Sequence, residues 1–161
     1  MPPVFPLPAA MARALELARA AADAGEVPVG AVVTRGGVVI GEGENRNRRD
    51  NDPTAHAEIV AIRAAAALLG DFRLTDCDLY VTLEPCPMCA GAIAHARIAR
   101  LYYGAGDPKG GGVEHGARVF ARPQCHHRPE VYGGLGEGEA ASLLVDFFAA
   151  RRRGGPQGDP S

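Results

Sequence analysis

Several residue types are scarce or missing in this sequence. Tryptophan is absent, lysine occurs once, as Lys109, and aromatic residues make up 6% of the 161 positions. Lysine and arginine together number 17 against 19 aspartates and glutamates, which gives a net charge of -2. A protein that coats nucleic acid with its whole surface needs a strong positive charge. The composition excludes that class but leaves room for a local basic face.

Long apolar runs and a secretory leader are also missing. No segment approaches the roughly 20 apolar residues that span a bilayer, and the start lacks the three regions of a signal peptide. We therefore expect a cytoplasmic protein without a membrane partner. Cysteine occurs four times, at Cys77, Cys86, Cys89 and Cys125. In a reducing compartment, metal binding or redox chemistry explains a close cysteine pair better than a disulfide framework does.

The residues that are present suit one globular domain. The chain is 47% apolar, and a domain of this size buries about 70% of its unfolded surface without help from disulfides. We expect a proline-rich arm over 1–8, one domain over 9–153 and a disordered tail over 154–161.

Periodicity and turn residues predict helices that alternate with strands. They indicate an α/β fold of three layers, α/β/α, in which a central mixed sheet of about five strands has helices on both faces. The second helix has apolar residues nearly all round, so we expect it to be buried on most sides. Helices are expected over 9–24, from a capping Thr54 to 69, over 85–97 and over 137–153, and strands over 29–34, 38–43, 78–84, 99–105 and 129–134.

A close cysteine pair stands at the start of the third predicted helix, in "PCPMC". The spacing of Cys86 and Cys89 places both side chains on one helix face, where free N–H groups and the helix dipole favour thiolates. The pair could be two small buried residues, a thioredoxin-like redox pair or a zinc site. A redox pair would follow the first strand of the fold, which this pair does not. Thiolates together with an imidazole suit zinc better than magnesium or calcium.

A zinc site needs four protein ligands, or three and a water. His56 is the best third ligand, because it also stands in the first turn of a buried helix. Glu58 supports this choice, since a carboxylate in such a helix costs several kcal/mol unless something compensates for it. A water on the metal would compensate for it. Glu58 would accept the proton of that water and return it to the substrate.

The segments "HAE" at 56–58 and "PCPMC" at 85–89 form the signature of the zinc-dependent nucleobase deaminases, H-x-E followed by P-C-x-x-C. Together with "VPVGAVV", "DPTAHAEIVAIR" and "LLVDFFAARRR", they resemble the bacterial tRNA-specific adenosine deaminases of the cytidine/deoxycytidylate deaminase superfamily. The resemblance covers about Leu7 to Arg153. It implies a cytidine-deaminase-like fold with one Zn²⁺ per subunit, held by His56, Cys86 and Cys89, and with Glu58 as the catalytic residue.

The resemblance also implies a substrate. The expected reaction is hydrolytic deamination of adenosine to inosine at the wobble position of an arginine tRNA, carried out by a homodimer on the anticodon stem-loop. Asn45 would bind the flipped nucleotide, Asp107 the RNA sugar, and the last helix the anticodon loop. His126 replaces an asparagine that is common in the family, and the loop after Lys109 also departs from the family pattern. The implied substrate-binding residues are Asn45, Ala57, Asp107, Lys109, His126, Phe148, Arg151 and Arg152.

Two other functions stay open at this point. A deaminase of a free nucleobase or nucleoside, such as guanine or cytosine, would share the same catalytic motif. The arginines of "DFFAARRR" favour RNA over a free base, which offers no phosphates. A binding module held together by zinc, without catalysis, would need a fourth ligand such as Cys77 or Cys125. That module would leave Glu58 without a role.

Overall fold

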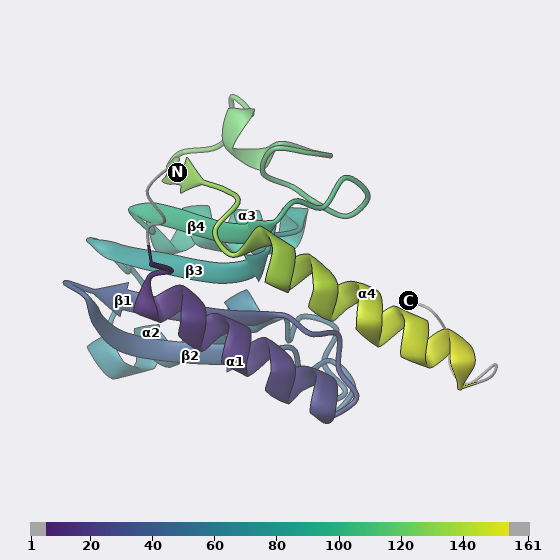
Figure 1. Ribbon diagram of the computed structural model, residues 1–161. Coiled ribbons are helices and arrows are strands. Elements are labelled where there is room, and N and C mark those ends of the chain that lie inside the picture. The colour runs from purple at the N-terminus through teal and green to yellow at the C-terminus, as the bar shows by residue number, and fades with distance from the viewer. Residues whose placement is uncertain (1–5, 155–161) are drawn as a thin grey trace.

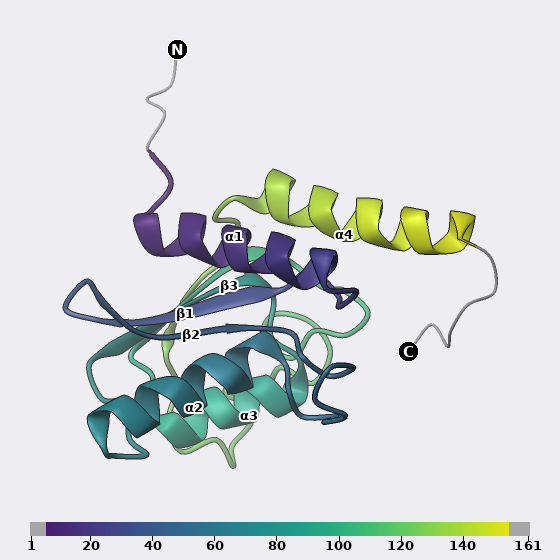
Figure 2. The same cartoon turned by 90° about the horizontal axis from the view of Figure 1, so that it is seen from below.

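A five-stranded sheet lies between two pairs of helices. Helices α1 (Ala9–Asp23) and α4 (Glu137–Arg153) cover one face, while α2 (Ala57–Leu69) and α3 (Pro87–Ala96) cover the other (Figures 1 and 2). The computed structural model describes residues 6–154, so the predicted arm over 1–8 and tail over 154–161 lie mostly outside the described residues. The predicted three-layer α/β/α architecture is confirmed.

The sheet is mixed and has the strand order β2-β1-β3-β4-β5. Strand β1 runs antiparallel to both of its neighbours, whereas β3, β4 and β5 are parallel. The parallel strands share one carboxyl edge, and ligand sites in open α/β sheets form outside such edges. The strands are β1 (Gly30–Arg35), β2 (Val38–Glu44), β3 (Cys77–Leu83), β4 (Arg100–Ala105) and β5 (Glu130–Tyr132), and the short helix η1 (Val119–Ala121) precedes β5.

A tight hairpin joins β1 and β2, whose strands were predicted over 29–34 and 38–43. Gly36 and Gly37 have φ angles of 57° and 79°, the conformation that a two-residue hairpin turn requires and that glycine adopts without strain. Strand β1, which lies between β2 and β3, is buried over its first five residues, because helices cover both faces of the sheet. The larger core cluster lies between the sheet and the α2–α3 layer and includes Leu79, Val81 and Ile93.

Helix α2 lies directly on the backbone of β2. Gly41 and Gly43 stand on the strand face that meets the helix. A Cβ atom on Gly43 would lie only 2.4 Å from the carbonyl oxygen of Ala57 and 2.7 Å from the backbone nitrogen of Ala61. The two glycines therefore fix how closely α2 approaches the sheet, and with it the position of the residues at the start of the helix.

The prediction that α2 is buried on most sides is wrong. Its buried residues, Ala57, Glu58, Ala61 and Ala65, form a single face. Leu68 is 67% exposed on the outer side. Only the alanine face meets the sheet closely, while Arg63, Ala64, Ala67 and Leu68 are exposed. Glu58 nevertheless lies on the buried face, as expected.

The predicted cap at Thr54 is also wrong, because His56, two residues later, is the N-cap of α2. The Thr54 hydroxyl and N–H both donate to Asp52 Oδ1, at 2.7 and 2.8 Å. Asp52 thus closes a turn that delays the helix. The C-terminal end follows the prediction, since Gly70 caps the helix with a φ of 66°.

The third helix begins immediately after β3. Cys86 is its N-cap, so the helix begins at Pro87, two residues later than predicted. Proline is favoured in the first turn of a helix. Within residues 6–154, no helix combines the length and the apolar composition that crossing a membrane requires.

Candidate active site

Three predicted ligand side chains meet where α2 and α3 begin. The Nδ1 atom of His56 lies 3.5 Å from the Cys86 sulfur and 3.4 Å from the Cys89 sulfur. All three ligand atoms lie within 4.8 Å of one another, and the described residues hold no other group of three or more potential ligands this close. The arrangement could hold one metal ion, and the donor set of one imidazole and two sulfurs fits zinc.

The charges of this group favour a cation. A hydrogen bond from the Cys89 thiol, assisted by the His56 imidazole, lowers the pKa of Cys86 to about 4, although burial opposes the shift. The pKa of Cys89 is raised, first because it donates that bond and then because it is buried. These opposite shifts favour a thiolate at Cys86 and a thiol at Cys89. Two helix N-termini add partial positive charge, which stabilises thiolates.

Glu58 lies beside this group on the buried face of α2 and is only 4% exposed. Burial raises its pKa, while the nearby His56 side chain partly offsets the shift. A carboxyl group with a raised pKa exchanges protons more readily near neutral pH than an exposed one does. The position and the chemistry of Glu58 therefore suit a proton carrier.

The group opens into a cleft of about 640 Å³. Asn45 and Asp107 line this cleft together with His56, Glu58 and Cys86. The Asn45 side-chain oxygen accepts the N–H of Ala57 at 2.9 Å, so its amide nitrogen is the group left for a ligand. The structure thus brings two predicted substrate residues to the predicted catalytic residues.

A second carboxylate organises the far wall of the cleft. Glu84 is 2% exposed and accepts backbone N–H groups at 2.9–3.1 Å, as well as His115 Nδ1 at 2.6 Å. Burial raises its pKa, but these donors outweigh burial and bring the pKa to about 2. An ionised Glu84 therefore fixes the loop that carries Asp107. The backbone donors are Asp107, Val113, Glu114 and His115.

Sequence reasoning did not find the buried carboxylates Glu26 and Glu84, although both line the cleft. Glu84 stands directly before "PC", and Glu26 stands between the first helix and the first strand. Each is a charged residue next to an apolar run, and this position in the sequence is the feature that could have indicated its burial. The contact of His115 with Glu84 gives this histidine a structural place in the same loop.

Other predicted residues are not among those that line the cleft. His126 is exposed and lines a separate hollow of about 330 Å³ beside α3 and η1. Phe148 is 40% exposed on α4, whose C-terminal half runs past the sheet (Figure 1). Arg151 donates to the carbonyl oxygen of Gly25 at 3.2 Å. Lys109, in the Asp107 loop, and Arg152 are exposed.

Neither remaining cysteine joins the ligand group. The Cys77 thiol, at the opposite end of β3, contacts the Thr75 carbonyl oxygen, and the Cys125 thiol contacts the His127 carbonyl oxygen. A zinc-held binding module would need one of these thiols as a fourth ligand. Their positions disfavour that function.

Comparison with known proteins places the chain in a family. Residues 8–152 match the MafB19-like deaminases. A tRNA-specific adenosine deaminase of Agrobacterium fabrum (strain C58 / ATCC 33970) is 58% identical over 142 residues, which cover 88% of this chain and 93% of the relative. This chain belongs to the tRNA-specific adenosine deaminases. The predicted enzyme class, a hydrolase that deaminates a base, is confirmed for this deaminase.

Solved structures agree with this assignment. A structure from studies of A-to-I editing by tRNA:A34 deaminases at the wobble position matches this deaminase with a TM-score of 0.83 and 58% identity. The match covers 84% of this chain and 98% of the other. A guanine deaminase from Nitrosomonas europaea matches with a TM-score of 0.73 and 28% identity, over 92% of this chain and 88% of the other. The cytidine-deaminase-like fold is therefore shared with deaminases of different substrates.

Proposed function

We propose that this chain deaminates the wobble adenosine of a tRNA, that of an arginine tRNA in particular, to inosine. One observation carries the proposal: a buried Glu58 stands beside the His56, Cys86 and Cys89 group in an open cleft. The 58% identity to a tRNA-specific adenosine deaminase supports this substrate over guanine or cytosine, since the guanine deaminase match is 28% identical.

The proposed cofactor is one Zn²⁺ per chain, held by His56, Cys86 and Cys89. When bound, zinc lowers the pKa of a water molecule and so supplies a nucleophile at neutral pH. Binding would also release the proton that Cys89 holds. The two helix starts bring the three side chains together.

Glu58 moves the protons in the proposed reaction. Its carboxylate takes one proton from the attacking water and gives it to the ring nitrogen of adenine. It then carries the second proton, from the hydroxyl group added to the ring, to the amine, which leaves as ammonia while the carbonyl group of inosine forms. The low exposure of Glu58 keeps bulk water from competing for this proton. Asn45 orients the base through its free amide nitrogen, and its side-chain oxygen stays fixed on Ala57.

The RNA itself would extend beyond the cleft. We propose that Ala57 borders the base, that Asp107 meets the sugar and that Lys109 meets a neighbouring phosphate, because these residues stand at or beside the cleft. Single-stranded RNA is held by stacking on aromatic rings and by arginine contacts to its backbone. The proposed outer contacts are Phe148, Arg151 and Arg152 on α4, and His126 beside η1.

A second subunit would complete this surface. We propose a cytoplasmic homodimer that pairs through the α2–α3 layer, because this layer carries exposed apolar side chains. Leu68 is 67% exposed, Phe72 68% and Met88 38%. Exposed apolar patches of this kind are typical of interfaces. A homodimer would also bring the partner copy close to the cleft.

The substrate proposal is tested with the purified chain and an anticodon stem-loop that carries adenosine at the wobble position. Inosine should form in this RNA, while guanine, cytosine and adenosine stay unchanged. A stem-loop with guanosine at the same position serves as the control. Ammonia release from a free base alone would overturn the tRNA assignment.

A further inference from the structure

Three arginines follow one another closely in the loop between β2 and α2, and they differ in their partners. Arg46 Nε donates to Asp50 Oδ2 at 3.0 Å. Arg49 donates to Glu26, to Glu44 and to the Asn45 carbonyl oxygen. The Arg48 guanidinium forms no hydrogen bond or ion pair with any residue in 6–154. It is the one guanidinium of this loop left for an outside anion.

The backbone of Arg48, by contrast, is held firmly by Glu26. Glu26 Oε1 accepts the Arg48 N–H at 3.1 Å, and Oε2 accepts the Arg49 N–H at 2.9 Å and Arg49 Nε at 3.3 Å. Glu26 is only 2% exposed. Burial raises its pKa, but the N–H groups of Arg49 and Arg48 and the Arg49 guanidinium outweigh burial and lower the pKa below its ordinary value. The carboxylate is therefore ionised.

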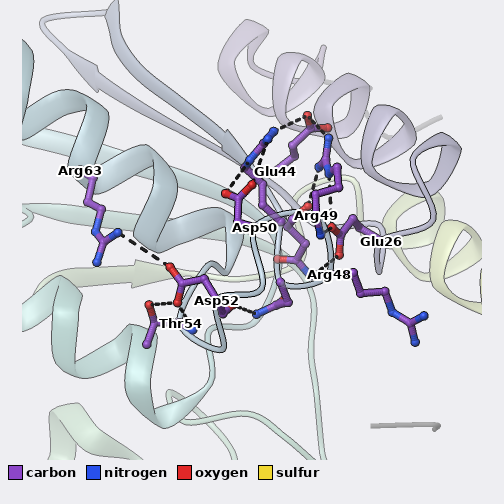
Figure 3. A network of polar contacts seen from close by, with 11 residues as sticks. Glu26, Glu44, Arg48, Arg49, Asp50, Asp52, Thr54 and Arg63 are labelled. Atoms are coloured by element: carbon purple, nitrogen blue, oxygen red, sulfur yellow. Dashed lines mark hydrogen bonds and ion pairs between the residues drawn. The ribbon is translucent and has the colours of Figure 1, made fainter. Parts of the chain in front are cut away.

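The direction of the Arg48 side chain follows from these hydrogen bonds, the Glu26 clamp, which hold the backbone of Arg48 and Arg49. Figure 3 shows the guanidinium turned away from the carboxylates that hold the other two arginines. Arg48 lines the same cleft as His56 and Glu58. A free guanidinium at the mouth of an active-site cleft is suited to a phosphate, which it can bind through two parallel hydrogen bonds.

Further hydrogen bonds connect the Glu26 clamp with the N-terminal end of α2, where Glu58 lies. The Arg49 guanidinium donates to the Asn45 carbonyl oxygen at 2.7 Å, and the Asn45 side chain accepts the N–H of Ala57 at 2.9 Å. Ala57 stands between His56 and Glu58. Glu26 thus sets the distance between Arg48 and the base-binding end of the cleft through a short chain of hydrogen bonds.

We propose that Arg48 binds a backbone phosphate of the RNA next to the nucleotide in the cleft, and that Glu26 is the positioning residue that holds Arg48 in place. The inference rests on the proposed function, because only a nucleic acid substrate presents a phosphodiester at this mouth. A free base would leave Arg48 without a ligand.

The test compares steady-state kinetics of the zinc-loaded protein on the wobble-adenosine stem-loop. Arg48→Ala should raise KM about tenfold, the expected loss for a charge-assisted hydrogen bond, and should change kcat less than twofold. The slope of log KM against log salt concentration should fall by about 0.7, which is one phosphate contact to single-stranded RNA. Arg48→Lys should restore most of this slope.

The matched control is Arg35→Ala. This variant removes the same charge from an exposed residue at the end of β1. Arg35 pairs with Cys77, at the start of β3, and therefore lies at the end of the sheet that is far from the cleft. KM and its salt dependence should stay at the wild-type values in this variant. An equal effect of both alanine variants would show a general charge effect and overturn the inference.

The role of Glu26 is tested by coupling. Glu26→Gln should raise KM about as much as Arg48→Ala, and the double variant should show no further rise, because both changes remove the same contact. If the increases in KM of the two single variants multiply in the double variant, the positioning role of Glu26 is overturned. If Glu26→Gln does not fold, Arg48→Ala still decides the phosphate contact. An unchanged KM in Arg48→Ala overturns this inference alone, whereas absence of inosine with the wild type overturns the proposed function and the inference with it.

Discussion

The carboxylate of Glu84 should make the folded protein sensitive to acid in a defined pH range. Its pKa lies at about 2 instead of the ordinary 4.5. A pKa depressed by folding stabilises the protein fully above the unfolded value, and the contribution is lost as the pH falls through the folded value. The critical window therefore lies between about pH 4.5 and pH 2.

The size of the effect follows from the shift. One pKa unit corresponds to about 1.4 kcal/mol, so ionised Glu84 contributes roughly 3 kcal/mol to the free energy of unfolding at pH 7. At pH 3 about 2 kcal/mol of this contribution should be lost. Glu84→Gln removes the titration and keeps the shape. The variant should be less stable than the wild type by about 3 kcal/mol at pH 7 and by about 1 kcal/mol at pH 3.

Urea unfolding of both proteins, followed by circular dichroism between pH 7 and pH 3, measures this difference. Loss of metal at low pH affects both proteins and cancels in the comparison. A stability difference that stays constant across the range would refute the reasoning, because it would mean that Glu84 titrates normally in the folded state.

Three further predictions concern the active site and its support. Glu58→Gln should lower turnover by about 10²–10⁴-fold, while the metal content, measured by atomic absorption, should stay unchanged. Loss of the metal would instead identify Glu58 as a ligand. Gly43→Ala forces a Cβ to within 2.4 Å of the Ala57 carbonyl oxygen, so unfolding should become easier by about 1–3 kcal/mol. Gly138→Ala, with nothing within 4 Å, should stabilise α4 slightly and serves as its control. A chelator should stop turnover, and added zinc should restore it in the wild type but not in Cys86→Ala.

The sequence predicted the order of helices and strands well, because apolar periodicity and glycines mark them. It missed the start of α2, since the competing turn depends on Asp52 accepting two bonds from Thr54. It also missed how exposed α2 is. A run of alanines looks apolar all round, yet only the face that meets Gly41 and Gly43 is buried.

The candidate ligands were predictable because their spacing is a local property of two helix starts. The roles of Glu26 and Glu84 were not predictable in the same way. Their partners are backbone N–H groups that lie 22 to 31 residues further along the chain, and no side-chain pattern marks such donors. Loops held by buried carboxylates therefore emerge only from the folded structure.

Inosine formation in the stem-loop is the most direct test of the central claim. Nucleosides from the wobble-adenosine RNA should be analysed by mass spectrometry after incubation with the wild type and with Glu58→Gln, each loaded with zinc. We expect one inosine per RNA with the wild type and almost none with the variant. Equal inosine from both proteins, or none from the wild type, would contradict this claim.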